Sequence, residues 1–164
     1  RLVLEQASAF SHLINVTSSP HFIADTAWPG IAAETLNRFS DQLRHNPQKT
    51  HQDFVALQVP QKSEHPIVLP DKLTQEGLAN GLKILQTVDY RKNIDQLSIP
   101  TAYLFGRLDK IVPYQTLLVM EKIHQNFFYH LFRKSGHAPF LSQPEAFVSV
   151  IQQFIEKPPC KPIL

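Results

Sequence analysis

The chain has 164 residues, about the length of one globular domain. Its 43% hydrophobic and 18% charged residues exclude an intrinsically disordered chain, and a formal net charge of +2 gives no electrostatic case for binding nucleic acid or an anionic membrane. The chain has one cysteine, Cys160, so we expect no internal disulfide. It has no apolar run long enough for a membrane span and no visible signal peptide, so we expect a cytoplasmic protein.

The first elements along the chain are short. Residues 1–9 are typical of the end of a helix, and residues 12–17 (HLINVT) of a short buried strand. A Ser-Ser-Pro sequence at 18–20 then interrupts regular structure, and an aromatic and proline-containing loop runs through Trp28, Pro29 and Gly30.

The middle of the chain, residues 31–91, has a helical pattern and no strand signal. Apolar residues recur at helical spacing, beginning with Ile31, Leu36, Phe39 and Leu43. Asn46-Pro47 supplies an N-cap followed by proline at the first helical position. Residues 59–70 contain three prolines and are expected to be mostly loop, whereas residues 74–88 predict another helix, weakened by its glycines at 77 and 81.

After residue 98, strands and helices alternate. Residues 101–105 (TAYLF) and 127–132 (FFYHLF) predict strands, and residues 114–125 and 145–156 predict helices, before a loose proline-rich tail. Strand–helix–strand alternation implies parallel pairing. We therefore expect an α/β fold: three parallel strands with flanking helices, and an all-helical insertion over one end of the sheet.

Ligands of open α/β sheets bind outside the carboxyl ends of the strands, which directs attention to two loops. Asp109 follows the 101–105 strand in the sequence GRLDKIVP, and His137 follows the 127–132 strand in SGHAPF. A histidine base needs an acid on its other ring nitrogen to fix its tautomer and to stabilise the imidazolium. Asp109 and His137 fit the last two places of a Ser–Asp–His triad read in chain order.

The residues around this pair resemble the closing part of α/β-hydrolases. The segments DYRKNIDQLSIPTAYLFGRLDKIVP (89–113) and SGHAPF (135–140) carry that resemblance. Three further segments, WPGI at 28–31, FVALQ at 54–58 and GLKILQTVD at 81–89, are similar to the BioH family, the pimeloyl-acyl-carrier-protein methyl ester esterases of biotin synthesis. The resemblance runs from about residue 10 to about residue 155.

The resemblance implies a carboxylesterase that uses no cofactor and no metal. Asp109 matches the triad acid and His137 the triad base. The resemblance also implies that the FVALQ stretch and His137 line an apolar channel that binds the acyl chain. The stretch comprises Phe54, Val55, Ala56, Leu57 and Gln58. Phe54 and Leu57 are one helical turn apart, so we expect them to share the channel face. An alternative for this stretch, and for Val55 and Ala56 above all, is plain packing between the insertion and the sheet.

The family docks acyl carrier protein through basic residues of the helical insertion. Lys49 matches one such position, with lysine where arginine is common, and Lys62 and Lys72 are further candidates. The insertion has equal numbers of basic and acidic residues, so an ordinary solvated surface is the alternative explanation for each lysine. The implied partner is an acyl carrier protein bearing a pimeloyl methyl ester.

No G-x-S-x-G nucleophile turn occurs in these residues. We expect the serine to lie upstream of Arg1, so that residues 1–30 hold the end of the nucleophile helix, a core strand and a loop. Residues 31–91 are then the helical cap, 92–157 the C-terminal core, and 158–164 a loose tail. By itself such a chain would be inactive, and the open edge of its first strand could lead to self-association.

Two other function classes stay open. One is a different α/β-hydrolase, a lyase or a thioesterase, that shares Asp109 and His137 but has another acyl pocket. The other is a non-catalytic binding domain of hydrolase shape. The eight histidines are scattered without metal-ligand spacing, and no phosphate-binding glycine motif is present.

Overall fold

The computed structural model describes residues 2–58 and 74–157. Between β1 (Leu13–Val16) and β2 (Thr101–Gly106) lie three longer helices, α2 (Ala33–His45), α3 (Pro47–Gln58) and α4 (Gln75–Thr87). After β2 come α5 (Gln115–Ile123), β3 (Phe128–Phe132), α6 (Pro139–Ser142) and α7 (Pro144–Glu156). The short elements are α1 (Leu2–Glu5) and two 3₁₀ helices at Ala7–Ala9 and Ile94–Gln96.

The three strands form one parallel sheet in the order β1-β2-β3. The register pairs Ile14 with Ala102 on one side of β2 and pairs Leu104 with His130 on the other. All six residues of the central strand β2 are buried. The predicted α/β fold with three parallel strands and flanking helices is thus confirmed.

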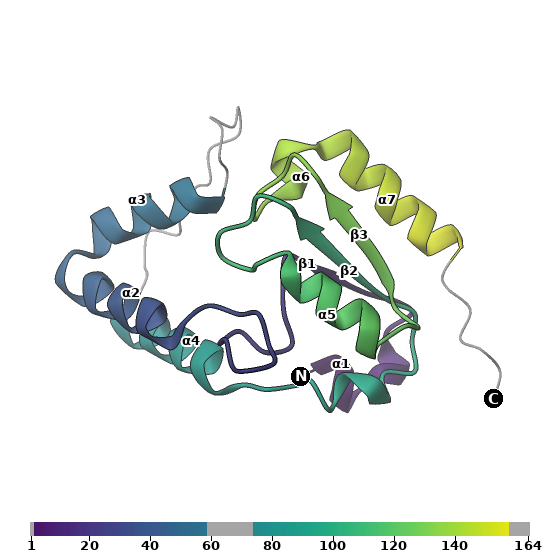
Figure 1. Ribbon diagram of the computed structural model, residues 1–164, viewed down its shortest axis with the longest axis horizontal. Coiled ribbons are helices and arrows are strands. Elements are labelled where there is room, and N and C mark those ends of the chain that lie inside the picture. The colour runs from purple at the N-terminus through teal and green to yellow at the C-terminus, as the bar shows by residue number, and fades with distance from the viewer. Residues whose placement is uncertain (1, 59–73, 158–164) are drawn as a thin grey trace.

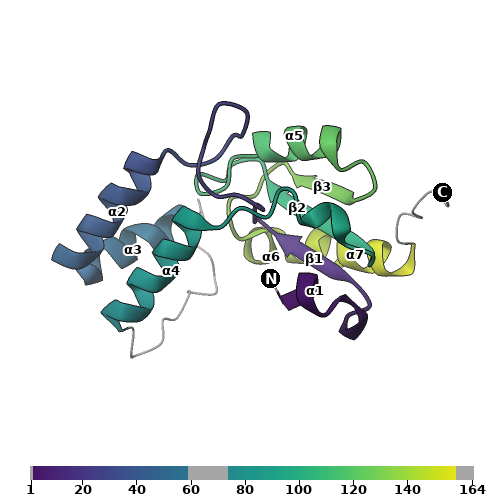
Figure 2. The ribbon, with the colours of Figure 1, turned by 90° about the horizontal axis from the view of Figure 1, so that it is seen from below.

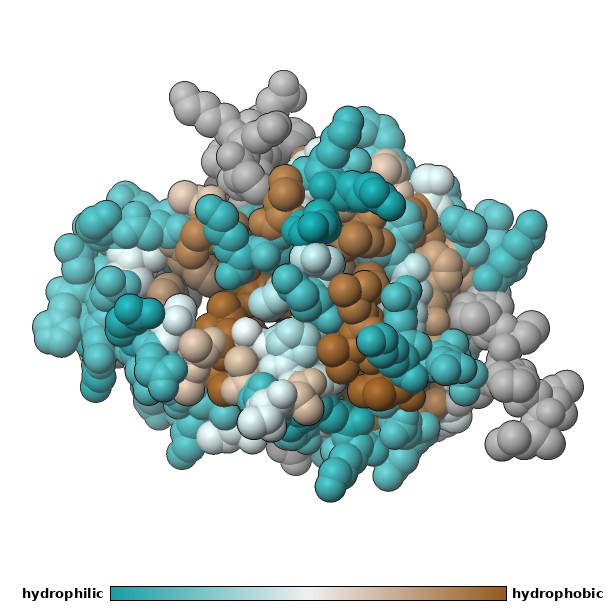
Figure 3. All heavy atoms as spheres, viewed as in Figure 1, coloured by the Kyte–Doolittle hydropathy of each residue, from teal (hydrophilic) through white to brown (hydrophobic). Residues whose placement is uncertain are grey.

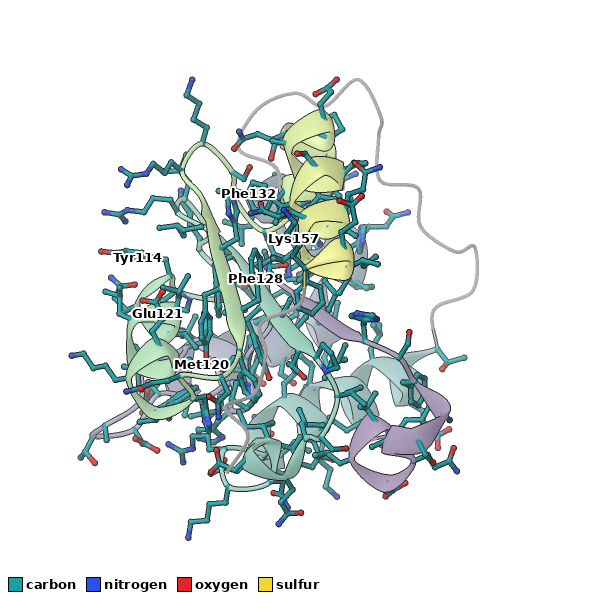
Figure 4. The ribbon with its side chains drawn as sticks, turned by 90° about the vertical axis from the view of Figure 1, so that its right-hand side faces the viewer. Tyr114, Met120, Glu121, Phe128, Phe132 and Lys157 are labelled. Carbon is teal, nitrogen blue, oxygen red and sulfur yellow. The ribbon has the colours of Figure 1, made fainter. Side chains whose placement is uncertain are left out.

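Alternate side chains of β2 enter two different cores. Tyr103 and Phe105 pack with Leu117 and Met120 of α5 on one face of the sheet. On the other face, Ala102 and Leu104 of β2 form a cluster with Phe132 of β3 and with Val150 and Phe154 of α7. Figure 4 shows the two layers from the side, with Phe128 and Phe132 between β3 and α7 and Met120 on the α5 side. Cover on both faces is what a parallel sheet requires, because its strands are apolar on both sides.

The helices α2, α3 and α4 form a separate layer beside the sheet, which we call the cap (Figures 1 and 2). The carboxyl ends of the strands point toward it (Figure 1). The rings of Phe39 (α2) and Phe54 (α3) are in tilted contact with centroids 5.4 Å apart, and Gln86 of α4 donates to Asn37 of α2 over 2.8 Å. At the start of α3 the Asn46 side chain accepts from the Lys49 amide, as expected for an N-cap followed by proline.

Several local expectations differ from the structure. The helix predicted for 1–9 breaks at Gln6 into α1 and a 3₁₀ turn. Ile31 does not begin the helical pattern but forms a bridge with Ile23. The 12–17 strand is half-buried rather than fully buried, because β1 is an edge strand of the described sheet. The loop expected at 59–70 and the tail at 158–164 with Cys160 lie outside the described residues. Among the helices that the structure describes, none has the length and apolarity to cross a membrane.

The chain crosses from core to cap and back at one place. The Tyr90 amide donates to the Pro20 carbonyl over 2.8 Å, and His21 forms a bridge with Asp89. Arg91 pairs with Asp89 and with Asp25, at 2.6 and 2.7 Å, so it joins both connections. Its hydrogen bonds lower the pKa of Asp89 to about 2, and the two carboxylates raise the pKa of the guanidinium.

Candidate active site

The two residues predicted to form a catalytic pair are in contact. Asp109 lies in the loop after β2 and His137 in the loop after β3, and Nδ1 of the histidine is 2.9 Å from Oδ2 of the aspartate. The other carboxylate oxygen, Oδ1, accepts from the amides of Ile111 and Val112 at 2.7 and 3.0 Å. The Asp109 side chain is fully buried, whereas that of His137 is 23% exposed. The carboxylate is therefore held on both sides and presents one oxygen to the imidazole.

The loops that carry this pair are fastened to each other. The Arg107 amide donates to the Phe132 carbonyl and the Leu108 amide to the Ser135 carbonyl, each over 2.9 Å. At Gly106 the two loops come so close that an added Cβ would lie 1.9 Å from the Gly136 carbonyl oxygen. Only glycine fits there, because any side chain would force the histidine loop away from the aspartate loop.

Thr17, at the end of β1, holds the histidine loop from the other side. Its hydroxyl donates to the His137 carbonyl over 2.8 Å, and its amide donates to the Leu104 carbonyl over 2.7 Å. Its φ of 44° lies in the left-handed region, which is unfavourable for a β-branched residue. Such strain costs on the order of 1–3 kcal/mol and persists only where surrounding contacts over-determine it, often at functional sites.

Ser135 is the serine that precedes Gly136 in the histidine loop, and its surroundings are structural. It is fully buried, donates to the Gln143 side chain over 2.8 Å and accepts from the Ser142 hydroxyl over 2.9 Å. These bonds tie the loop to the start of α7. A hydroxyl that is enclosed and used in this way is unsuited to attack a substrate.

A cavity of about 560 Å³ lies between the core and the cap. On the core side, the lining residues come from the end of β1, the loop after it, and the loops after β2 and β3: Thr17, Ser18, Ser19, Phe22, Ile111, Val112 and His137. The cap side is mainly apolar and includes Leu36, Phe39 and Leu43 of α2 and Leu78, Leu82 and Leu85 of α4. Figure 3 shows the face of the molecule seen in Figure 1, with hydrophobic residues in its middle, between the hydrophilic outer surfaces of cap and core. The imidazole of the pair thus opens into an apolar space.

The FVALQ stretch contributes only one of its faces to this cavity. Phe54, Val55 and Gln58 line it, together with His51 one turn earlier. Ala56 and Leu57 are not among the lining residues, and Leu57 is 41% exposed. The expectation that Phe54 and Leu57 share the channel face is therefore corrected. The lining residues 51, 54, 55 and 58 follow the i, i+3, i+4, i+7 spacing of one helical face, to which residues 56 and 57 do not belong.

The basic residues proposed for docking a carrier protein are only partly described. Lys49 lies on the outer surface of α3, with its side chain 68% exposed, and its Nζ is 3.0 Å from Asp53 Oδ2 one turn along. Lys62 and Lys72 lie outside the described residues. Within the part of the chain that the structure describes, no three His, Cys, Asp or Glu side chains gather as they would around a metal ion.

The fold and this pair can now be compared with known proteins. The family model described as the alpha/beta hydrolase fold matches residues 38–144, well over half of the chain. The chain belongs to the α/β-hydrolase fold family. Two solved structures agree with this hydrolase fold: an esterase from Exiguobacterium antarcticum (TM-score 0.77, 17% identity, 90% of this chain and 57% of that one) and a bromoperoxidase from Bacillus anthracis (TM-score 0.74, 15% identity, 90% and 58%).

Several curated relatives carry the name pimeloyl-[acyl-carrier protein] methyl ester esterase. The protein from Legionella pneumophila (strain Corby) is 44% identical over 156 residues, which cover 95% of this chain and 65% of the relative. The protein from Photorhabdus laumondii is 33% identical over 166 residues, covering 96% of this chain and 64% of the relative. The chain therefore spans about two-thirds of the length of the curated relatives that it matches.

Sequence reasoning did not single out several residues of the site. Thr17 was noted only as part of a strand end, and nothing in its identity signals a left-handed backbone. The apolar residues of α2 were recognised by their helical spacing, but the pattern alone does not separate a core face from a cavity face. His51 could have been found, because it extends the Phe54–Gln58 face backward by one turn.

Proposed function

We propose that this chain is the C-terminal part of a carboxylesterase that hydrolyses the methyl ester of pimeloyl-acyl carrier protein, with a Ser–His–Asp triad whose serine lies upstream of Arg1. The observation that carries the proposal is the buried Asp109 carboxylate bonded to an imidazole that faces an apolar cavity. The shared name of the curated relatives, at up to 44% identity, supports the choice of substrate.

In the proposed mechanism Asp109 orients His137, and His137 transfers the protons. Asp109 accepts a hydrogen bond from Nδ1–H of His137, which leaves Nε2 unprotonated and able to take the proton of the serine hydroxyl. The serine oxygen attacks the ester carbonyl, and the imidazolium then gives its proton to the departing methoxide, releasing methanol. Water, activated by the same imidazole, hydrolyses the acyl-enzyme to the free carboxylic acid and returns the serine. The route uses only side chains and water.

The apolar cavity supports a polymethylene substrate. Each methylene buried there contributes roughly 0.8 kcal/mol to binding. Leu36 and Leu43, both lining α2, are seven residues apart, so the lined length of that helix is about 10 Å. A cavity of this length holds several methylenes with the ester at the His137 end.

Carrier-protein docking is proposed at the outer face of α3, where Lys49 is exposed. The family resemblance implies that carrier protein docks on basic residues of the cap, and Lys49 matches one of these positions. Asp53 already pairs with this lysine, so one residue supplies a small share of the attraction. Lys62 and Lys72 are proposed as further contributors.

The proposal is tested with the complete polypeptide, which includes the segment upstream of Arg1. The purified protein is incubated with pimeloyl methyl ester on a carrier protein, and methanol release is measured beside a carrier-free methyl ester. We expect release from both substrates, faster from the carrier-linked one. Hydrolysis of the thioester in place of the methyl ester would favour a thioesterase. A polypeptide with glycine or alanine at the nucleophile position, and no methanol release, would favour a binding domain.

A further inference from the structure

Three of the six polar side chains that line the cavity, those of Thr17, Ser19 and His137, have hydrogen bonds within the described residues. The Thr17 hydroxyl donates to the His137 carbonyl, and the Ser19 hydroxyl donates to the His21 carbonyl. Among the described residues, two side chains on the cap side have no intramolecular partner, His51 and Gln58, both on α3. A half-buried polar group without a partner is unfavourable unless water or a ligand satisfies it.

His51 and Gln58 occupy different ends of the same helical face. They are seven residues apart, about two turns or 10 Å, with Phe54 and Val55 between them. α3 starts on the side of the cap away from the sheet and ends toward the core (Figures 1 and 2). His51 is on an earlier turn of α3 than Gln58, so it lies farther from the core end of this helix. The outer cavity therefore contains an imidazole in mainly apolar surroundings.

We infer that His51 forms a second polar subsite, which donates a hydrogen bond to a carbonyl oxygen at the end of the acyl chain opposite the ester. The inference rests on the proposed function and adds to it a recognition element for the far end of the substrate. In the proposed substrate that acceptor is the thioester carbonyl, separated from the methyl ester by the polymethylene chain. An ester bound at His137 places this carbonyl in the outer cavity, where His51 lies.

The subsite changes which substrates are preferred. Apolar lining alone binds a plain fatty ester as well as a chain that ends in a carbonyl, since burial of methylenes does not depend on the terminus. A donor in the outer cavity favours the carbonyl, because a plain chain leaves the imidazole unpaired after water has been displaced. His51 is thus a specificity-determining residue with no part in the bond-breaking steps.

The experiment compares two methyl esters of equal chain length in the complete polypeptide. One is the methyl ester of pimeloyl-N-acetylcysteamine, which ends in a thioester, and the other is methyl heptanoate, which ends in a methyl group. Both are tested on wild type, His51→Leu, His51→Gln and Gln52→Ala. Gln52 is exposed and does not line the cavity, so it is the matched control on α3.

We expect His51→Leu to reduce kcat/KM for the thioester about three- to tenfold, mainly through KM, since one neutral hydrogen bond is lost. Methyl heptanoate should be hydrolysed as before, His51→Gln should retain more than half of the preference, and Gln52→Ala should change neither substrate. Equal losses on both esters, or no loss on either, overturn the subsite. Wild type that releases no methanol from either ester overturns the proposed function and the subsite with it.

Discussion

In the core all six residues of β2 are buried, whereas in the cap α4 has no buried side chain among those that the structure describes. The core strands alternate between two packed clusters, one under α5 and one under α7. Cap helices instead turn their apolar faces toward a cavity of about 560 Å³. Apolar residues therefore have different roles in the two regions. In the core they pack against each other, while in the cap they leave apolar surface that a ligand can cover.

The same contrast separates the two kinds of function that a hydrolase needs. The proposed catalytic pair, Asp109 and His137, lies on loops that are bonded to each other and to strand ends, which hold the two side chains within hydrogen-bond distance. The selective surface sits on helices whose packing is incomplete without a ligand. Substitutions in the core should therefore change turnover, and substitutions in the cap should change the range of substrates.

The largest effect is expected from His137→Ala in the complete polypeptide. Loss of the base should lower kcat for the methyl ester by at least about 10³-fold. The melting temperature should stay close to that of wild type, because the side chain is partly exposed at a cavity wall. Lys134→Ala, an exposed change in the same loop, serves as the control. Retained activity in the histidine variant would rule out the triad assignment.

A smaller effect is expected in the cap, where Phe54→Ala is compared with Leu57→Ala. Phe54 lines the cavity, and losing part of an aromatic contact worth roughly 1.5 kcal/mol should raise KM for a pimeloyl ester about tenfold. A short acetate ester should be little affected. Leu57, on the exposed face, should give wild-type kinetics on both substrates. If the two variants behave alike, the assignment of faces on α3 is wrong.

The effect of Lys49→Glu should be smaller again and confined to one substrate. Reversing an exposed charge on α3 should weaken use of carrier-linked ester by a few-fold, more at low salt than at high salt, because screening weakens surface attraction. A small free ester should be hydrolysed as by wild type, and Lys83→Glu on α4 provides a matched charge change. Equal loss on both esters would count against docking at this face.

The smallest effect is expected where cap and core meet, from Asp89→Asn. The pKa of Asp89 is depressed from 3.8 to about 2, so its stabilising contribution is present above pH 3.8 and disappears as pH falls toward 2. With 41% of the side chain exposed, solvent screening limits the loss at pH 7 to at most about 1 kcal/mol. The melting temperatures of wild type and variant should approach each other as pH falls through about 2. A gap as large at pH 2 as at pH 7 would assign the stabilisation to something other than this carboxylate.

The elements of the core were predictable because their signals are local. TAYLF and FFYHLF are short apolar runs between turn residues, and both form parallel strands within a residue or two of the expected bounds. The contact of Asp109 with His137 followed from the rule that neighbouring parallel strands end at one edge. The left-handed backbone of Thr17 was not predictable, since it depends on bonds to Leu104 and His137, which are distant in sequence.

The helices of the cap were predictable from the sequence, but the residues that line the cavity were not. Helical spacing identified Phe39 and Leu43 as one apolar face, but a face that packs and a face that borders a cavity have the same spacing. Whether Leu57 or Gln58 lines the cavity together with Phe54 depends on how α3 is rotated about its axis. The contact between Phe54 and Phe39 of α2 fixes that rotation. The rotation of a helix depends on the elements packed against it, so the sequence of the helix alone does not predict it.

The adjoining connections at Pro20 and Tyr90 have an evolutionary consequence. The segment that carries the three cap helices begins after Pro20 and ends before Tyr90, and a hydrogen bond of 2.8 Å joins the Tyr90 amide to the Pro20 carbonyl. The core strands on either side do not need the intervening helices to bring their ends together. Because the entropy of closing a loop rises only slowly with its length, an insertion at such a site can grow, shrink or be exchanged at little cost to the framework. New substrate ranges can therefore arise by replacement of the inserted helices while the core loops that carry Asp109 and His137 are inherited unchanged.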